Sequence, residues 1–364
     1  MLKSNEKKRM FVVMVAIVGC LFVVSEARAD WLERGKLLAS DGAADDGFGV
    51  SVSISADFAI MGARLDDDKG SESGSAYIFR WDGTDWVQQQ KLTASDGAAY
   101  DSFGYSVSIS ADYVIVGAPY DDDNGSYSGS AYIFSWDGTG WVQQQKLLAS
   151  DGATWDLFGV SVSISGDLAI VGAYEDDDNG YESGSAYIFW WDGTSWIEQA
   201  KLAASDAEAG DYFGQDVSIS GDYAIVGAYR DADNGAGSGS AYMFKRQGRS
   251  WIQQDKLLPS DGAAGDYFGI SVSISGDYAI VGAAWDDDNG SYSGSAYIFA
   301  LAPTPVDIDI KPGSYPNAIN LGSHGLIPVA ILSSEDFDAK TVDPDTVELA
   351  GANIEVKVKG KSNT

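Results

Sequence analysis

The stretch from Phe268 to Phe299, FGISVSISGDYAIVGAAWDDDNGSYSGSAYIF, occurs five times in this chain with small changes. Its opening Phe-Gly pair recurs every 55 residues, as do the later Gly-Ala pair and the phrase Gly-Ser-Ala-Tyr. A fixed period of this length is typical of repeat architectures, in which one unit cannot bury its apolar face alone and must stack on its neighbours. The five Phe-Gly pairs begin at Phe48, Phe103, Phe158, Phe213 and Phe268.

Each copy predicts four short strands. Ser271–Ser275 alternates small polar with β-branched residues, Tyr278–Ala283 is more continuously apolar, and Ser295–Phe299 follows an acidic loop. The fourth strand is clearest at Trp86–Leu92 and Trp141–Leu147, each after an Asp-Gly hairpin signal. No helical periodicity occurs in this region, so the sequence predicts an all-β fold.

The ends of the array suggest how the repeats are arranged. Four-stranded units of this period are typical of β-propeller blades. The fifth copy stops after Phe299 without its Trp…Lys-Leu strand, whereas a spare copy of that strand stands at Trp31–Leu38. We therefore expect residues 30–302 to form a five-bladed β-propeller that the N-terminal strand closes, which would remove an exposed sheet edge. An open or extended array is the alternative.

The Phe-Gly opening and the Gly-Ala-Pro phrase, complete at Gly117-Ala118-Pro119, resemble the FG-GAP repeat of integrin α-subunit propellers and of many bacterial secreted proteins. The resemblance covers residues 31–300. It implies a propeller and, more loosely, adhesion or extracellular ligand binding. The chain departs from the integrin type in its blade number and in the short connection between the first two strands, as at Gly166-Asp167, where integrin blades often carry a calcium loop.

The two ends of the chain differ from the repeats. Residues 1–29 combine basic residues with a short apolar run, which predicts a signal peptide cleaved after Ala29 and a secreted or cell-surface protein. Lipid anchoring at Cys20, the sole cysteine, is the alternative. Beyond a Pro-rich linker, residues 303–364 predict a small and possibly incomplete β module with strands near 306–310, 326–332 and 354–358.

The net charge and the lack of catalytic motifs argue against several classes of function for this sequence. The net charge of −31 argues against nucleic acid and anionic membranes as partners. The only histidine, His324, lies in a Gly-Ser-His-Gly loop, and no catalytic motif is present, so we expect no enzyme. The expectation is a monomeric binding or adhesion module for an extracellular protein or glycan, without a membrane span after signal removal. The alternatives are a glycan hydrolase that uses paired carboxylates and a purely structural scaffold.

Aromatic residues in or beside turns could stack on sugars or contact a protein, although packing at strand ends is an alternative role for them. These residues are Trp190, Trp285, Tyr120, Tyr174, Tyr181 and Tyr292.

The acidic loops after Gly-Ala offer oxygen ligands of the kind that Ca²⁺ prefers. We expect the first and third acidic residues of each loop to converge while the middle one faces water; a solvated turn without metal is the alternative. The candidate Ca²⁺ ligands are Asp66, Asp68, Asp121, Asp123, Asn124, Asp176, Asp178, Asn179, Asp231, Asp233, Asn234, Asp286, Asp288 and Asn289.

Overall fold

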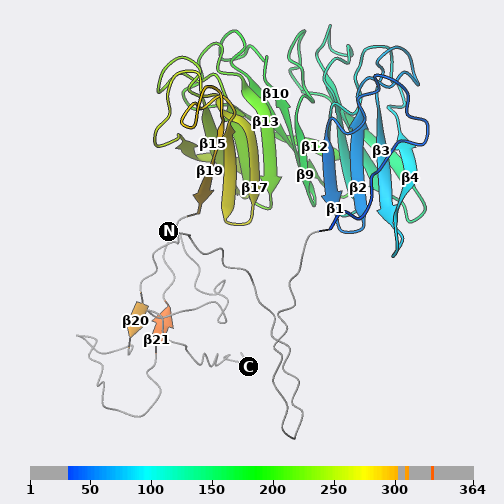
Figure 1. The fold of residues 1–364 in the computed structure, drawn as a ribbon. Helices are drawn as coiled ribbons and strands as arrows, with labels where there is room; N and C mark the ends of the chain where they lie inside the picture. Colours follow the sequence, from blue (N-terminus) through cyan, green and yellow to red (C-terminus); the bar gives the residue numbers. More distant parts are fainter. Residues whose placement is uncertain (1–31, 302–307, 311–328, 332–364) are drawn as a thin grey trace, which may run out of the picture. The chain divides into compact units, whose positions relative to one another are not determined.

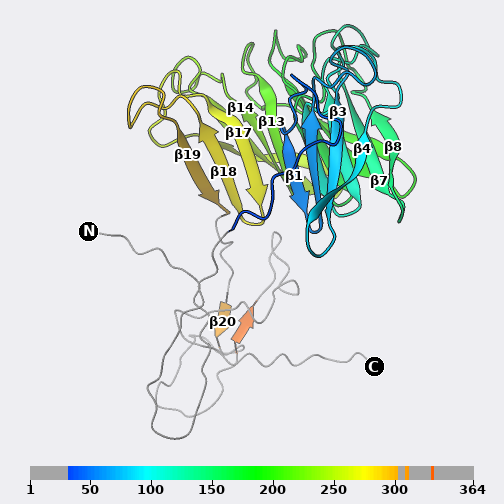
Figure 2. The same cartoon turned by 45° about the vertical axis from the view of Figure 1, so that its right-hand side comes forward.

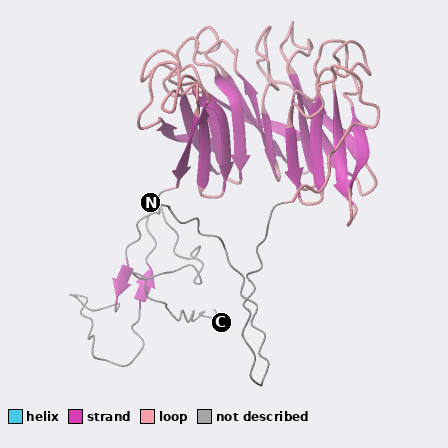
Figure 3. Cartoon of the chain, in the orientation of Figure 1, coloured by secondary structure: helices cyan, strands magenta, loops and turns pink. Residues whose placement is uncertain are grey.

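The computed structural model describes residues 32–301, 308–310 and 329–331 (Figure 1). Its described residues form strands, turns and loops without a helix, so the all-β prediction is confirmed for them (Figure 3). The chain divides into two units, Met1–Ala300 and Leu301–Thr364. No helix in the described part of the chain is long and apolar enough to span a membrane.

The first four repeats each form a four-stranded antiparallel sheet in which neighbouring strands follow one another in sequence. Sheet 1 contains β1 (Val52–Ser55), β2 (Phe58–Ala63), β3 (Ser75–Trp81) and β4 (Trp86–Leu92). Sheet 2 contains β5 (Ser106–Ser110), β6 (Tyr113–Ala118), β7 (Ser130–Trp136) and β8 (Trp141–Leu147). Sheet 3 contains β9 (Val162–Ser165), β10 (Leu168–Ala173), β11 (Ser185–Trp191) and β12 (Trp196–Leu202). Sheet 4 contains β13 (Phe213–Ser220), β14 (Tyr223–Ala228), β15 (Ser240–Gln247) and β16 (Ser250–Leu257).

Sheet 5 has three strands, β17 (Phe268–Ser275), β18 (Tyr278–Ala283) and β19 (Ser295–Ala300). The expected fourth strand from the N-terminal segment is not there, because residues 32–38 are assigned no strand. The five repeats therefore form five sheets without a closed ring among the described residues, and closure of a five-bladed propeller stays a prediction.

The first two strands of each sheet are joined by a two-residue turn that needs a left-handed backbone. Glycine takes this conformation without steric cost, as at Gly166 (φ 60°) and Gly276 (φ 55°). Repeats 1 and 2 place Ala56 (φ 49°) and Ala111 (φ 50°) in the same conformation. The strands pair as expected across this turn, for example Ser110 with Tyr113.

Successive sheets stand side by side, and the first strand of each contacts the first strand of the next (Figure 2). Apolar clusters fill the spaces between neighbouring sheets. The Phe of each Phe-Gly pair lies at the centre: Phe103 is fully buried and meets the rings of Tyr132 and Phe134 edge-on at 5.4 and 6.0 Å. Phe158, Phe213 and Phe268 are fully buried in the same way, whereas Phe48 at the end of the array is partly buried.

Glycines allow neighbouring repeats to approach closely. A Cβ on Gly62 would lie 1.9 Å from the carbonyl oxygen of Gly104 in the next repeat. The same contact recurs between Gly117 and Gly159, so both motifs that define the repeat meet at one place on each interface.

The C-terminal unit contains β20 (Ile308–Ile310) and β21 (Val329–Ile331), which pair antiparallel. They agree with the first two strands expected there. The expected strand near 354–358 and His324 lie outside the described residues, as do the signal peptide and Cys20.

Candidate functional site

The long loops that join the second and third strands all emerge at one end of the sheets (Figure 1). The chain also enters each first strand at this end, because the strands of a sheet alternate in direction. We call this surface the loop face. It carries the acidic loops and most of the turn aromatics that the sequence singles out.

Four acidic loops fold around a lysine ammonium group. In repeat 2, Lys146 Nζ lies 2.8 Å from Asp121, 2.6 Å from Asp123 and 2.9 Å from Asp96. The hydroxyl of Tyr132, which is fully buried, lies 3.0 Å from carboxylate oxygens of both Asp121 and Asp96, which share its single proton. The first and third loop aspartates therefore converge as expected, and the group at their centre is a lysine from the fourth strand.

The same constellation recurs in repeats 1, 3 and 4. Its lysines are Lys91, Lys201 and Lys256, each within 3 Å of three aspartates. In repeat 4 the carboxylates of Asp206, Asp231 and Asp233 lie within 4.8 Å of one another.

Hydrogen bonds between opposite charges shift the pKa values of the lysine and one aspartate in the repeat 2 cluster. Burial by itself would lower the pKa of the Lys146 ammonium, but its hydrogen bonds to Asp121 and Asp123 outweigh burial and raise that pKa. Burial likewise opposes the ionised form of Asp96, yet the hydrogen bond from Lys146 holds the pKa of Asp96 below its ordinary value. Each cluster is thus a partly buried ion network that ties the loop to the fourth strand.

The fifth cluster contains Asp261, Asp286 and Asp288 around the hydroxyl of Tyr297. No lysine reaches it among the residues that the structure describes. The neighbouring carboxylates Asp286 and Asp261 raise the pKa of Asp288, which shows uncompensated negative charge.

The remaining predicted ligands have backbone roles in the loop. The exposed middle residue Asp122 accepts a hydrogen bond from the N–H of Tyr127 at 2.8 Å, and the N–H of Asn124 donates to Ser128. Asn179, Asn234 and Asn289 repeat that bond. The asparagines therefore complete the turn and do not join the carboxylates at the lysine.

Two rows of contacting aromatic rings cross the loop face. Tyr120 contacts both Tyr105 and Tyr127, and Tyr127 lies 4.6 Å from Trp155 between ring centroids. The second row has successive centroid separations of 4.5–5.6 Å. Its members, in order, are Tyr174, Tyr212, Tyr229, Tyr267, Trp285 and Tyr292.

Charged side chains accompany the rings. Arg64 lies 5.1 Å from the ring centroid of Tyr105, and Arg230 lies 4.7 Å from that of Tyr212. Burial raises the pKa of the Glu175 carboxyl, and burial is also the main cause of the raised pKa values of the Tyr120 and Tyr229 hydroxyls, to which the Glu175 charge adds. The charge of Glu175 therefore acts on a tyrosine of each row.

These aromatic rows occupy positions at which the repeats differ. The residue just before the first aspartate of each loop is different in every repeat, whereas the aspartate itself is constant. The five residues at this position are Leu65, Tyr120, Glu175, Arg230 and Trp285.

Sequence reasoning found part of this surface. Of the predicted turn aromatics, the structure places Tyr120, Tyr174, Trp285 and Tyr292 in the rows, and Tyr181 is exposed on a loop of the same face. Trp190 instead lies at the strand end in sheet 3, where its Nε1 donates to Asp167 at 3.0 Å.

Several members of the surface were missed, although aligning the five repeats at their 55-residue spacing would have marked many as variable. They are Tyr105, Tyr127, Trp155, Tyr212, Tyr229, Tyr267, Arg64, Arg230 and Glu175. The cluster lysines were also missed, because each lies 25 residues from its buried aspartate.

Comparison with known proteins agrees with the fold. The family model described as FG-GAP repeat matches residues 31–79, 86–134, 141–189, 196–244 and 251–299. The last four matched segments each begin at the tryptophan of a fourth strand and end in the third strand of the following sheet, so the family's unit spans two neighbouring sheets. No curated protein matches the chain. The chain belongs to the FG-GAP repeat family.

Proposed function

We propose that this protein is a secreted or cell-surface binding module, without catalytic activity, that recognises its ligand with the aromatic rows of the loop face. The observation that carries the proposal is the contrast between a constant scaffold and a variable loop position. Five near-identical repeats present Leu65, Tyr120, Glu175, Arg230 and Trp285 at one equivalent place. A purely structural role would not need five different side chains there.

The chemistry of this surface favours a saccharide. Aromatic rings stack on the apolar faces of sugars, while charged and hydroxyl groups bond to the sugar hydroxyls. Trp155 and Trp285 are each about half exposed, at 53% and 48%, so part of each side chain can contact a ligand. An extracellular protein that inserts an apolar side chain between the rings is the second candidate.

A glycan array tests the proposal, followed by calorimetry on any hit. Replacing Trp155→Ala and Trp285→Ala should weaken binding at least tenfold, since each stacked ring contributes on the order of 1 kcal/mol or more. Trp190→Ala, an aromatic outside the rows, is the matched control and should bind normally. Equal affinity in all three variants would contradict this site. Hydrolysis of a polysaccharide that one carboxylate substitution abolishes would contradict the non-catalytic role.

We also propose that the two free ends of the array of sheets are joined, as in a closed propeller. In the structure the array has two free ends, and the residues exposed at each end are buried in every interior interface. Contact between a repeat 5 face and a repeat 1 face, within one chain or between two copies, would therefore complete the ring-type packing of the fold.

We also propose that Ca²⁺ binds to an acidic loop, but at the fifth cluster only and not at all five loops as the sequence predicts. Lysine already supplies the positive charge in four clusters, so Ca²⁺ would have to displace it there. The carboxylates of Asp261, Asp286 and Asp288 fit a weak cation site better. Calorimetry should detect at most one Ca²⁺ per chain, lost in Asp288→Asn, and an absence of heat at ~10 mM Ca²⁺ would reject it.

A further inference from the structure

Repeat 1 carries one half of a sheet-to-sheet interface. Leu37 and Ala39 pack beside Phe48 against Met61 and Tyr77, as the equivalent residues Leu92 and Ala94 do in the next interface. Ser40 N–H donates to the Gln88 side chain at 2.8 Å, which repeats the bond from Ser95 to Gln143. The segment therefore already lies where it would follow the fourth strand of a preceding sheet.

The side chains that such a sheet would cover are exposed. Val52 and Ile54 are each 66% exposed, whereas their equivalents Val107 and Ile109 are each 5% exposed. We call the surface formed by Val50, Val52, Ile54, Trp81 and Trp86 the repeat 1 end face.

Sheet 5 exposes the complementary side. Ile280 and Ile298 are 44% and 72% exposed, although the equivalent Ile115 and Ile133 are fully buried against the next repeat. Together with Tyr278, which is 63% exposed, they form the repeat 5 end face.

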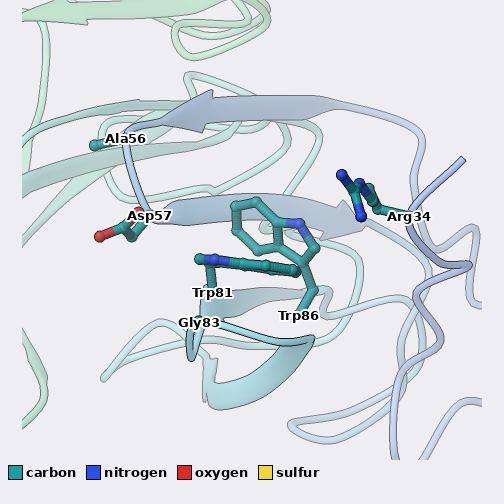
Figure 4. Close-up of a pocket in the computed structure, with 6 residues that line it drawn as sticks. All are labelled: Arg34, Ala56, Asp57, Trp81, Gly83 and Trp86. Carbon is teal, nitrogen blue, oxygen red and sulfur yellow. The ribbon is translucent and has the colours of Figure 1, made fainter. Parts of the chain in front are cut away.

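A pocket on the repeat 1 end face matches the exposed tyrosine. Trp81 and Trp86 line it together with Arg34, Ala56, Asp57 and Gly83 (Figure 4). In the next interfaces the equivalent tryptophan pairs receive Phe58 and Tyr113 from the preceding repeat, at centroid distances of 5.4–6.3 Å. Tyr278 is the residue at that position in repeat 5.

The backbone groups of the two faces also match. In the interior, Ser51 and Ser53 accept hydrogen bonds from the N–H groups of Val107 and Ile109 in the next repeat. The exposed Ser271 and Ser273 hold the same places at the repeat 5 end face. Gly282, whose counterparts touch the next repeat, has no atom closer than 3.8 Å to its Cβ position.

The fifth acidic cluster lacks the lysine that the other four hold. By the 55-residue period, Lys36 of the N-terminal segment is the equivalent of Lys91 and Lys146. It is exposed and makes no ion pair with another described residue. A sheet 5 that gained residues 32–38 as its fourth strand would gain this ammonium group at Asp261, Asp286 and Asp288.

We propose that these two end faces bind each other between copies of this chain, so that the N-terminal segment of one copy adds a fourth strand to β19 of the next. Four interior interfaces repeat the same serine and glycine contacts, which fixes nearly the same rotation at each step. Five repeats joined in this way leave the ends apart. A second copy can meet each exposed end face with the contacts that the interior interfaces already show. Such a head-to-tail contact forms a ring or a filament according to its rotation.

This inference replaces the expectation of a monomer and does not depend on the proposed ligand. Disulfide trapping tests it, with Cys20→Ser in every variant to remove the sole native cysteine. Leu32→Cys and Ala300→Cys occupy the positions equivalent to the paired residues Val87 and Arg80 of sheet 1. Opposed cysteines on antiparallel strands are close enough to bridge. The double variant should form a ladder of disulfide-linked oligomers on mild oxidation.

The matched control is Arg80→Cys with Val87→Cys, which should form a bridge within single chains. A Leu32/Ala300 bridge found only within monomers would overturn the proposal in favour of self-closure. Absence of any bridge while the control oxidises would show that the ends do not meet, as would be the case if another part of the chain covers sheet 5.

Sedimentation of the full chain without engineered cysteines provides the second measurement. The apparent mass should rise with protein concentration, and Gly282→Ala should abolish the rise, because the new methyl group would meet the backbone of the incoming Gly49. Its thermal unfolding at low concentration should be unchanged, since the position is open within one chain. A concentration-independent mass for the parent chain, or unaltered association of Gly282→Ala, would contradict the proposal.

Discussion

At the scale of single residues, each cluster lysine is largely buried and lies among three carboxylates. Lys146 joins a buried aspartate and two exposed ones, with its side chain 15% exposed. A partly buried ion network of this kind is sensitive to the loss of one partner, because the remaining charges stay desolvated.

We predict that Lys146→Met destabilises the protein by about 2–3 kcal/mol, less than the loss of a fully buried pair because water still reaches the cluster. Urea unfolding measures the change. Asp122→Asn is the control: it keeps the acceptor for the Tyr127 N–H and should lie within about 0.5 kcal/mol of the parent. Equal stability of both variants would show that the network contributes nothing net.

Asp216 predicts a pH dependence. Four repeats have serine at this place, while Asp216 accepts the N–H of Val272 at 2.8 Å, and burial raises its pKa to about 6. Its ordinary value is 3.8, so the folded protein binds this proton more tightly than the unfolded chain. Stability from this group is therefore full below about pH 4 and is lost as the pH rises through about 6.

The variant Asp216→Ser should consequently gain about 1–2 kcal/mol over the parent at pH 7.5 and almost nothing at pH 4. Thermal unfolding of both proteins across this range measures the difference. A gain that does not vary with pH would mean that the carboxyl titrates normally in the folded protein.

At the scale of the element, the interfaces depend on glycine more than on side-chain volume. A Cβ on Gly117 would lie 1.9 Å from the Gly159 oxygen and 2.4 Å from Ser106 Oγ. Ser106 begins β5, and Gly159 lies in the turn before β9 with its N–H bonded to the Gly172 oxygen at 3.0 Å, so both obstacles can move little.

We expect Gly117→Ala to cost about 2–4 kcal/mol, because the methyl group must separate sheets 2 and 3. Hydrogen exchange should show faster opening at that interface. Gly83→Ala, in an exposed hairpin turn with open space around it, controls for backbone strain, since its φ of 103° penalises alanine without any clash. Comparable losses at both positions would remove the steric explanation.

The sequence predicts these elements closely. Trp86–Leu92, Trp141–Leu147 and Tyr278–Ala283 are expected strands and match β4, β8 and β18 residue for residue. Alternation and turn signals are local, so they identify strands well. The convergence of Asp121 and Asp123 is expected from the loop itself, but the place of Lys146 between them could not be predicted in the same way, because it depends on which strands become neighbours.

The N-terminal segment illustrates a different limit. The pattern of residues 31–38 is that of a fourth strand, but a strand needs a partner edge, and the structure does not bring β19 to it. Residue pattern gives the tendency to pair, whereas the rotation between sheets decides whether the pair forms.

At the scale of the whole molecule, negative charge opposes the compact state. The net charge is −31, and neighbouring like charges repel across the surface. The lysine clusters relieve only part of this repulsion.

We therefore predict that raising NaCl from ~0.01 to ~0.5 M increases the midpoint of thermal unfolding, since screening weakens long-range repulsion more than contacts between paired, partly buried groups. Sodium sulfate at equal ionic strength separates this effect from general salting-out, which would be larger for sulfate. A lower midpoint in NaCl would show that attraction within the ion clusters outweighs repulsion.

The repeat unit that the family model matches begins in one sheet and ends in the next, and this offset affects how genes for such proteins can change in length. The last four matched segments each supply the last strand of one sheet and the first three of the next. Unequal recombination between two copies, 55 residues apart, therefore adds or removes one whole unit and regenerates an intact junction on both sides. Arrays of this kind can lengthen or shorten by single steps while they keep their folding units complete, and each new copy brings a fresh loop position for selection to diversify.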